Sequence, residues 1–225
     1  MKFVIIHFNT PELTACLCSS IKKFHSDANI VIFDNSDKLP FKNKDILCNS
    51  YIDNTNNTII NFDNEFKTLP IVESVWNLNK CGSAKHCRTI QWLFDNLEDD
   101  EFVLLDSDVL LIKQLDFFNS KFSCAATYEV FPNMKHRFLP FVTYFNLKLL
   151  REKHIHYFDV KRMNGLSIEG EQYDTGASFL EDVINNNLPF LNINFNNYLV
   201  HFKNGSWSTK SYQQWLINFK QYWLY

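Results

Sequence analysis

The sequence feature that most constrains the fold is an apolar run that leads directly into two carboxylates. Residues 102–111 read Phe-Val-Leu-Leu-Asp-Ser-Asp-Val-Leu-Leu, with Asp106 and Asp108 separated by one serine. Consecutive apolar residues are typical of a strand buried on both faces, as in the centre of a parallel sheet. Two uncompensated buried charges would cost several kcal/mol, comparable with the net stability of a domain. Oxygen ligands suit a divalent cation, so the stretch predicts a metal-dependent site; a loop with two solvated acids is the alternative.

The composition is that of a globular protein without a charge bias towards nucleic acid. The 225 residues fit one large domain, and 46% hydrophobic and 21% charged residues are ordinary values. The net charge of −3 gives no basic surface, so we expect no nucleic-acid partner. The six cysteines form no Cys-x-x-Cys motif, which favours free thiols in a reducing compartment. Without a long apolar stretch or a signal-like start, we expect a cytoplasmic protein.

Strand and helix patterns alternate along the first half of the chain. Residues 3–8 read as a buried strand, a helix capped by Thr10 runs to about residue 25, and residues 30–33 form a second strand. This order predicts an α/β fold with a mostly parallel, doubly wound sheet flanked by helices, whose site lies at the carboxyl ends of the strands. Later strands are expected at residues 58–62, 122–128 and 198–202, and later helices after Ser83 and after Asp174.

Two further segments carry a function hypothesis beside a plain structural one. The residues just ahead of the helix at Ser83 are either a phosphate seat, because free N–H groups at a helix start attract anions, or an ordinary cap. Residues 212–223 have the apolar spacing of an amphipathic helix. That helix either packs on its own domain or, through its Trp and Tyr residues, brings residues 210–225 to a membrane interface.

Taken in this order, the chain resembles nucleotide-sugar-dependent glycosyltransferases of the GT-A fold, nearest the bacterial family 2 type. The resemblance covers about residues 1–112, with a weaker likeness over 168–207. It rests on four short motifs: His7-Phe8-Asn9-Thr10, Asp34-Asn35-Ser36, Asn79-Lys80-Cys81-Gly82-Ser83-Ala84 and Asp106-Ser107-Asp108. It implies a single Rossmann-like GT-A domain, with a nucleotide-sugar-binding half at 1–112 and an acceptor-side half at 113–225.

The resemblance also implies roles for individual residues. Asp34 would accept a hydrogen bond from the pyrimidine base of the donor, in a pocket lined by His7 and Asn9. Asp108 would bind Mn²⁺ or Mg²⁺ at the diphosphate, while Asp106 would hold the ribose or a metal-bound water. His201 resembles the third metal ligand. Read without the resemblance, Asp34 is a turn cap and His201 an ordinary strand-end histidine.

The chain departs from the family pattern at two places. After Gly82 the pattern expects Ala-Arg-Asn, whereas Lys85 and His86 stand here as candidate diphosphate contacts. The Glu-Asp pair that usually opens the acceptor helix is absent. Asp174 is the candidate in its place, either as the catalytic base or as a hydroxyl anchor, with a plain N-cap as its structural alternative.

The implied activity is that of a metal-dependent, hexosyltransferase-type enzyme. It would move a sugar from a nucleotide-sugar, most simply a UDP-sugar, to a glycan or lipid-linked acceptor in bacterial surface polysaccharide synthesis; peripheral contact with the inner face of the cytoplasmic membrane is the alternative for residues 210–225. Inversion with Asp174 as the base is our hypothesis, with retention left open. Two alternatives remain: a haloacid-dehalogenase-like phosphatase with Asp106 as nucleophile, and a non-catalytic sugar-binding module. The basic residues at 136–137 and 151–156 either meet an anionic acceptor or form a solvated face.

Overall fold

The computed structural model describes residues 1–67, 82–132, 134–163 and 171–202. Its contacts divide the chain into two compact units. The first unit comprises Met1–Asn56, Leu105–Asp116 and Asn194–Tyr225, and the second comprises Asn57–Leu104 and Phe117–Ile193. The expected helix at 212–223 and the motif residues 79–81 lie outside the described residues. Division of the chain at residue 112 into donor and acceptor halves stays a prediction.

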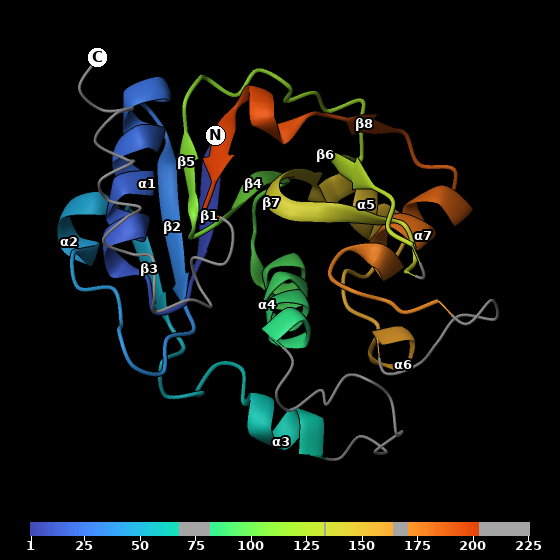
Figure 1. Cartoon of the computed structure of the whole chain (residues 1–225), viewed down its shortest axis with the longest axis horizontal. Helices are drawn as coiled ribbons and strands as arrows, with labels where there is room; N and C mark the ends of the chain where they lie inside the picture. The colour runs from blue at the N-terminus through green and yellow to red at the C-terminus, as the bar shows by residue number, and fades with distance from the viewer. Residues whose placement is uncertain (68–81, 133, 164–170, 203–225) are drawn as a thin grey trace. The chain divides into compact units, whose positions relative to one another are not determined.

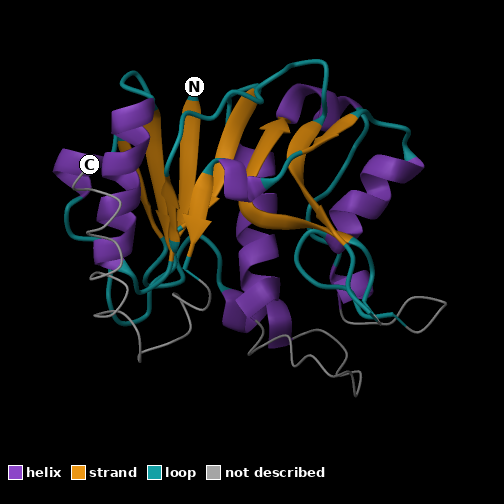
Figure 2. Cartoon of the chain, turned by 45° about the horizontal axis from the view of Figure 1, so that its top comes forward, coloured by secondary structure: helices purple, strands orange, loops and turns teal. Residues whose placement is uncertain are grey.

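The first unit is built on three parallel strands in the order β3-β2-β1. Strands β1 (Lys2–His7) and β2 (Asn29–Asp34) are buried along almost their whole length, as expected for runs of branched and aromatic residues. Strand β3 (Ser50–Asp53) pairs with β2, and the short helix α2 (Lys44–Leu47) precedes it. Helix α1 (Pro11–Phe24), with Pro11 in its first turn, lies alongside these strands (Figures 1 and 2). The predicted strands at 3–8 and 30–33 and the helix from Thr10 are confirmed.

A second, two-stranded sheet completes the first unit. Strand β5 (Val109–Leu111) pairs antiparallel with β9 (Leu199–His201), so that Val109 lies opposite His201. The short 3-10 helix η2 (Phe195–Asn197) leads into β9. Leu110 packs against Leu13 of α1, which holds β5 on the apolar face of that helix. The predicted last strand at 198–202 is confirmed.

The second unit has the strand order β4-β7-β6-β8. Strand β6 (Cys124–Glu129) pairs antiparallel with β7 (Arg137–Asn146) and parallel with β8 (Phe190–Asn192). Strand β4 (Glu101–Asp106) is buried from Phe102 to Leu105. The three parallel pairs β1–β2, β2–β3 and β6–β8 confirm the α/β class with its mostly parallel sheet.

The helices described in the second unit are α3 (Phe62–Lys67), α4 (Gly82–Asn96), α5 (Leu147–Glu152), α6 (Val160–Met163) and α7 (Ala177–Asn185). Helices α4 and α7 contribute to a cluster of aromatic rings. Phe94 of α4 and Phe179 of α7 both stand edge-on to Phe145 of β7, with ring centroids 5.0 and 5.5 Å away. No helix in the described parts of the chain is both long and apolar enough to cross a bilayer.

Three local predictions need correction. The strand expected at 58–62 is wrong: Asn61 accepts a hydrogen bond from the backbone N–H of Asn64 and so starts α3 at Phe62. Helix α4 begins at Gly82, one residue before Ser83. The N-cap of α7 is Gly176, not Asp174. Gly176 has φ = 80°, and a Cβ there would collide with the carbonyl of Phe138, so only glycine fits.

Candidate active site

The Asp-Ser-Asp motif forms a turn between two strands, and the pairing of β5 with β9 brings a histidine to it. Asp106 ends β4, as predicted for acids at a carboxyl end, and Asp108 immediately precedes β5. The backbone N–H of Phe202 donates to the carbonyl of Asp108 at 2.9 Å. In this register the Nε2 of His201 lies 3.6 Å from Oδ1 of Asp108. Residues that are remote in sequence therefore meet within the first unit.

The electrostatics of Asp106 reflect this crowding. Burial, and secondarily the neighbouring charge of Asp108, raise the pKa of Asp106 to about 7, while His201 acts in the opposite direction. Asp108 itself is only 5% exposed. Placing two acids in so dry a position is costly unless positive charge is brought to them. Burial and the neighbouring carboxylate therefore both disfavour the ionised form of Asp106 in this turn.

The serine between the two acids ties the turn to the start of helix α1. The hydroxyl of Thr10 donates to the Oγ of Ser107 at 2.9 Å, and both side chains are buried. Thr10 occupies the predicted N-cap position, but its side chain makes no capping hydrogen bond. An N-cap hydroxyl normally contributes about 1 kcal/mol to a helix. Here that hydroxyl fixes the acidic turn instead, a role that the sequence did not indicate.

The exits of β1 and β2 are joined into one ordered loop, residues 35–41. Asn9, with φ = 55°, accepts the backbone N–H groups of Lys38 and Leu39 at 3.0 and 2.9 Å through its side-chain oxygen. The backbone N–H of Asn9 donates to Ser36 Oγ at 2.9 Å. His7 contacts Thr14 through Nδ1 at 2.7 Å and the carbonyl of Leu39 through Nε2 at 3.1 Å. His7 and Asn9 therefore both contact this loop, and their role in a donor pocket stays a prediction.

Asp34 is committed to the same loop. Its Oδ1 accepts the backbone N–H of Ser36, and its Oδ2 accepts the backbone N–H of Phe41 and the hydroxyl of Tyr51, at 2.7–2.8 Å. The side chain is fully buried. These contacts match the turn-capping alternative for Asp34. A hydrogen bond from Asp34 to a nucleobase stays a prediction, and it would need the carboxylate to exchange one of these partners.

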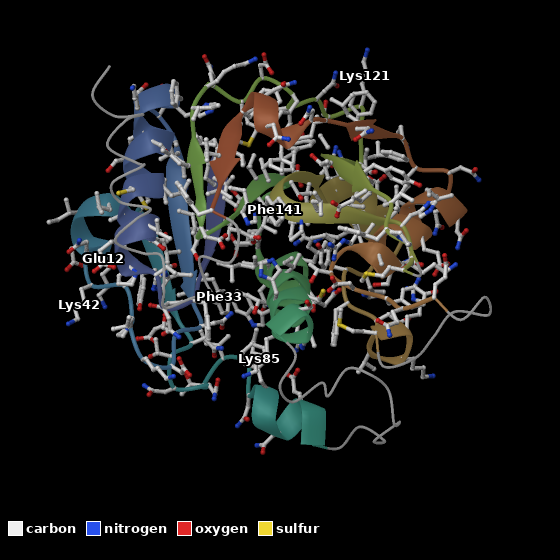
Figure 3. All side chains as sticks on the ribbon, viewed as in Figure 1. Glu12, Phe33, Lys42, Lys85, Lys121 and Phe141 are labelled. Atoms are coloured by element: carbon white, nitrogen blue, oxygen red, sulfur yellow. The ribbon has the colours of Figure 1, made fainter. Side chains whose placement is uncertain are left out.

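The candidate diphosphate contacts lie in the second unit, at the start of α4. Lys85 extends from the first turn of this helix (Figure 3), and its Nζ lies 5.5 Å from the ring centroid of Phe62. Gly82 is the first residue of the helix, and His86 is half-buried. Basic side chains at a helix N-terminus suit an anion, but residues 68–81, which lead into this turn, lie outside the description.

Asp174 forms an ion pair that sequence reasoning missed. Its Oδ2 accepts a hydrogen bond from Arg137 Nη1, and its Oδ1 accepts the backbone N–H of Thr175 at 2.7 Å. Arg137 also donates to Glu129, which lies opposite it in the β6–β7 ladder, at 3.3 Å. The pair of Glu129 and Arg137 could be predicted from their opposite positions on neighbouring strands, but only once the hairpin register is known.

The basic segments are also committed to internal partners. Arg151 donates to the carbonyl oxygens of Phe94 and Leu97 at 2.5–3.0 Å, which satisfies the end of α4. Arg137 binds two carboxylates, as described above. Both arginines therefore have internal partners, while residues 151–154 remain exposed, in keeping with the solvated-face alternative.

The structure also weakens the phosphatase alternative. That reading needs a second acidic pair to bind its metal, and Glu181-Asp182 is the nearest candidate in the sequence. On α7, both carboxylates accept hydrogen bonds from Arg162, Glu181 at 3.1 Å and Asp182 at 2.7 Å. A pair held by a guanidinium already has its compensating cation.

The described residues include side chains that could bind a metal ion, but these side chains are not arranged as a complete coordination sphere. Among the described residues, no group of three or more His, Cys, Asp and Glu side chains is arranged to hold a metal ion. Asp106, Asp108 and His201 nevertheless supply two carboxylates and an imidazole, which are ligands that Mn²⁺ and Mg²⁺ accept. Burial and Asp108 raise the pKa of Asp106, and a cation bound by both carboxylates would lower it again. By donor chemistry the three residues fit.

Comparison with known proteins identifies the fold. No protein-family model matches the sequence, and no curated protein sequence matches it. Mouse xyloside xylosyltransferase 1, in its apo form, is similar in structure with a TM-score of 0.53 at 10% identity, over 87% of this chain and 86% of that chain. The galactosyltransferase LgtC, in complex with donor and acceptor sugar analogues, gives a TM-score of 0.48 at 13% identity, over 87% and 74% of the two chains. This second likeness is too distant to support an argument. The chain has a GT-A-like glycosyltransferase fold.

Proposed function

We propose that the protein is a metal-dependent glycosyltransferase that moves a sugar from a UDP-sugar to a glycan or lipid-linked saccharide acceptor. The observation that carries this proposal is the approach of His201 to Asp108 at 3.6 Å, beside the acid that ends β4. The carboxyl end of a strand in an α/β sheet is where such folds bind ligands. The fold itself supports the class of enzyme, and the acidic turn supports the metal.

In this proposal Asp108 and His201 hold Mn²⁺ or Mg²⁺, and Asp106 acts as a third ligand or binds the ribose. A bound divalent cation would neutralise charge on the leaving nucleoside diphosphate as a Lewis acid. The bond between Thr10 and Ser107 keeps the two carboxylates in place before any ligand arrives. Such preorganisation matters because a donor set that must first rearrange loses binding energy.

The nucleobase would lie against the loop that follows β2. His7 and Asn9 fix the backbone of this loop, and Asp34 fixes its two ends. Phe8 and Leu39 remain 37% and 54% exposed there, which offers apolar surface to the flat face of a base. In this arrangement Asp34 supports the pocket wall. Taken by itself, the start of α4 at Gly82, Lys85 and His86 is our candidate for a diphosphate contact, since α4 presents its first-turn N–H groups together with a lysine.

Asp174 would act on the acceptor. Its two oxygens already bind Arg137 and the N–H of Thr175, so it is oriented rather than mobile. An oriented carboxylate can accept a hydrogen bond from an acceptor hydroxyl. Whether it also takes the proton, as inversion requires, is decided by the anomeric configuration of the product, read by NMR.

The decisive experiment is a panel of nucleotide-sugars tested with Mn²⁺, with Mg²⁺ and with EDTA, using release of the nucleoside diphosphate as the readout. We expect release from a UDP-sugar only with a divalent cation. Release of inorganic phosphate from phosphomonoesters would instead support the phosphatase. Binding of sugars without cation and without any release would support a non-catalytic module.

The cellular role follows from the acceptor class. We propose surface polysaccharide synthesis in a bacterium, with residues 210–225 at the inner face of the cytoplasmic membrane. The aromatic content of that segment supports this placement. Co-sedimentation with anionic lipid vesicles, compared between the full chain and a chain ending at residue 209, tests it.

A further inference from the structure

The tip of the β6–β7 hairpin exposes an aromatic ring beside a half-buried network of charges. Phe131 is 37% exposed in the loop that follows β6. The guanidinium carbon of Arg137 lies 4.8 Å from the centroid of this ring, so one face of the ring rests on a cation. Arg137 is in turn held by Glu129 and Asp174. A surface ring that is fixed in this way loses little further entropy when a ligand stacks on it.

The polar side chains around Phe131 bind one another, but not every oxygen among them accepts a hydrogen bond. Arg137 and Asp174 are each 15% exposed, and Glu129 is 29% exposed. Glu129 accepts both hydrogen bonds from Arg137 through Oε2. Its Oε1 has no hydrogen-bond partner among the described residues. It is therefore available to accept a hydrogen bond from a ligand hydroxyl next to the ring.

The hairpin is fastened to the segment that carries Asp174. The backbone N–H of Lys135 donates to the carbonyl of Gln172 at 2.9 Å, and Met134 forms a parallel bridge with Gln172. Lys135 also approaches Glu171 at 3.6 Å. The hairpin that carries Phe131 and Glu129 is thus joined by backbone contacts to the segment that carries Asp174.

The charge of this surface selects its ligand. Two carboxylates, Glu129 and Asp174, surround one guanidinium, which leaves a net negative charge. A phosphate, sulfate or carboxylate would be repelled there. A saccharide, by contrast, offers hydroxyl donors to Glu129 and Asp174 and a face of C–H groups to the exposed side of Phe131.

We propose that Phe131, Glu129, Arg137 and Asp174 form the binding surface for a saccharide that bears no acidic group. With the proposed function, this saccharide is the part of the acceptor next to the accepting hydroxyl. Glu129 and Asp174 accept its hydroxyl hydrogen bonds, Phe131 carries its apolar face, and Arg137 positions the other three. That this saccharide is the acceptor rests on the proposed function, whereas the binding of a saccharide at this surface does not.

The test is retention of the full-length chain on an immobilised panel of neutral and of uronic-acid-containing oligosaccharides. We expect retention on neutral glycans, weakened about fivefold by Phe131→Ala, which corresponds to the loss of about 1 kcal/mol from an aromatic contact. Glu129→Gln, which keeps the shape and removes the charge, should weaken it less. Val130→Ala is the matched control: Val130 is 58% exposed in the same loop and makes none of these contacts.

Three outcomes overturn the proposal: no retention on any neutral glycan, retention confined to acidic glycans, or equal retention of Phe131→Ala and wild type. Because Phe131 lies at the surface, its replacement should leave the fold intact, which near-UV circular dichroism checks. UDP-sugar hydrolysis by the wild type is measured separately. A protein that binds neutral glycans through Phe131 but hydrolyses no donor would contradict the proposed function and leave this surface standing.

Discussion

All four arginines of the sequence belong to the second unit, and the first unit has none. In the second unit, guanidinium groups hold Asp174 and Asp182 in ion pairs. In the first, Asp34 is held by N–H groups and a tyrosine hydroxyl, and the Asp106–Asp108 turn lies beside a histidine. A guanidinium is a permanent cation, so Asp174 and Asp182 already have a compensating charge. Asp106 and Asp108 lie beside a histidine instead, and they are the acids that we propose as ligands of a divalent cation.

The largest effect should follow from removing an acid of the first unit. Asp108→Ala should lower Mn²⁺-dependent UDP-sugar hydrolysis by about 10²-fold or more, the usual effect of removing one preorganised electrostatic group. It should also abolish the rise in melting temperature that Mn²⁺ gives the wild type. Coupled UDP release and thermal unfolding with and without Mn²⁺ measure both effects.

Asp27→Ala is the control, because Asp27 is an exposed acid of the same unit. Its hydrolysis rate and its response to Mn²⁺ should equal those of the wild type. If Asp108→Ala retained both, Asp108 would not be a metal ligand. The contrast drawn from the arginines would then fail.

The second effect is on stability and concerns the second unit. Arg137→Leu should lower the free energy of unfolding, because it leaves Glu129 and Asp174 facing each other without their cation. Breaking a buried ion pair costs about 3–5 kcal/mol. These side chains are partly exposed, which screens the charges and reduces the expected loss to about 2 kcal/mol. Urea denaturation followed by fluorescence measures it.

Arg137→Lys provides the matched comparison. It keeps the positive charge but cannot bridge two carboxylates with a planar fork, so it should recover roughly half of the loss. A wild-type stability for Arg137→Leu would mean that the ion pairs contribute nothing, and that Asp174 is held in place by its backbone contacts instead.

The third effect should have the opposite sign. Asp106→Asn removes a charge that burial and Asp108 disfavour, as the raised pKa of Asp106 shows. In EDTA at pH 8 it should therefore stabilise the fold by at least about 1 kcal/mol, since one pKa unit corresponds to about 1.4 kcal/mol. Asp174→Asn should destabilise under the same conditions. If Asp106→Asn and Asp174→Asn both lowered the free energy of unfolding, the charge of Asp106 would not be unfavourable in the fold.

The strand that ends in Asp106 and the helix that follows Thr10 could be predicted from the sequence. Strand β4 and its terminal acid followed from a run of apolar residues, and α1 followed from Thr10, Pro11 and the helical spacing of Leu13 and Leu17. These signals are local, because burial and caps act on neighbours in the chain. The strand expected at 58–62 failed for a local reason too, since the capping of α3 by Asn61 outweighed a short β-branched run.

The partners of the site residues were not predictable in the same way. The bond from Thr10 to Ser107 and the pair of Arg137 with Asp174 join residues that no periodicity relates. The approach of His201 to Asp108 was anticipated through the resemblance alone, and its geometric cause, the β5–β9 register, appears only in the fold. Polar pairing depends on tertiary register, so the sequence predicted which residues matter better than what they contact.

The smallest effect is a pH dependence, and it separates the two units once more. Burial lowers the pKa of His7 below its ordinary value of 6.5, although Asp34 opposes this. His7 protonates at a lower pH in the fold than in the unfolded chain because its pKa is lowered, so the stability that it supports falls as pH drops below about 6.5. Between pH 8 and pH 5.5 we expect His7 to account for up to about 1 kcal/mol of lost stability. Guanidinium pairs do not titrate in this range, so the loss should come from the first unit.

Urea denaturation of wild type and His7→Gln at both pH values isolates it, and hydrogen exchange should accelerate first in residues 35–41, which His7 holds through Leu39. An unchanged pH dependence in His7→Gln would move the effect to another group, such as His25, whose Nε2 accepts the backbone N–H of Leu115.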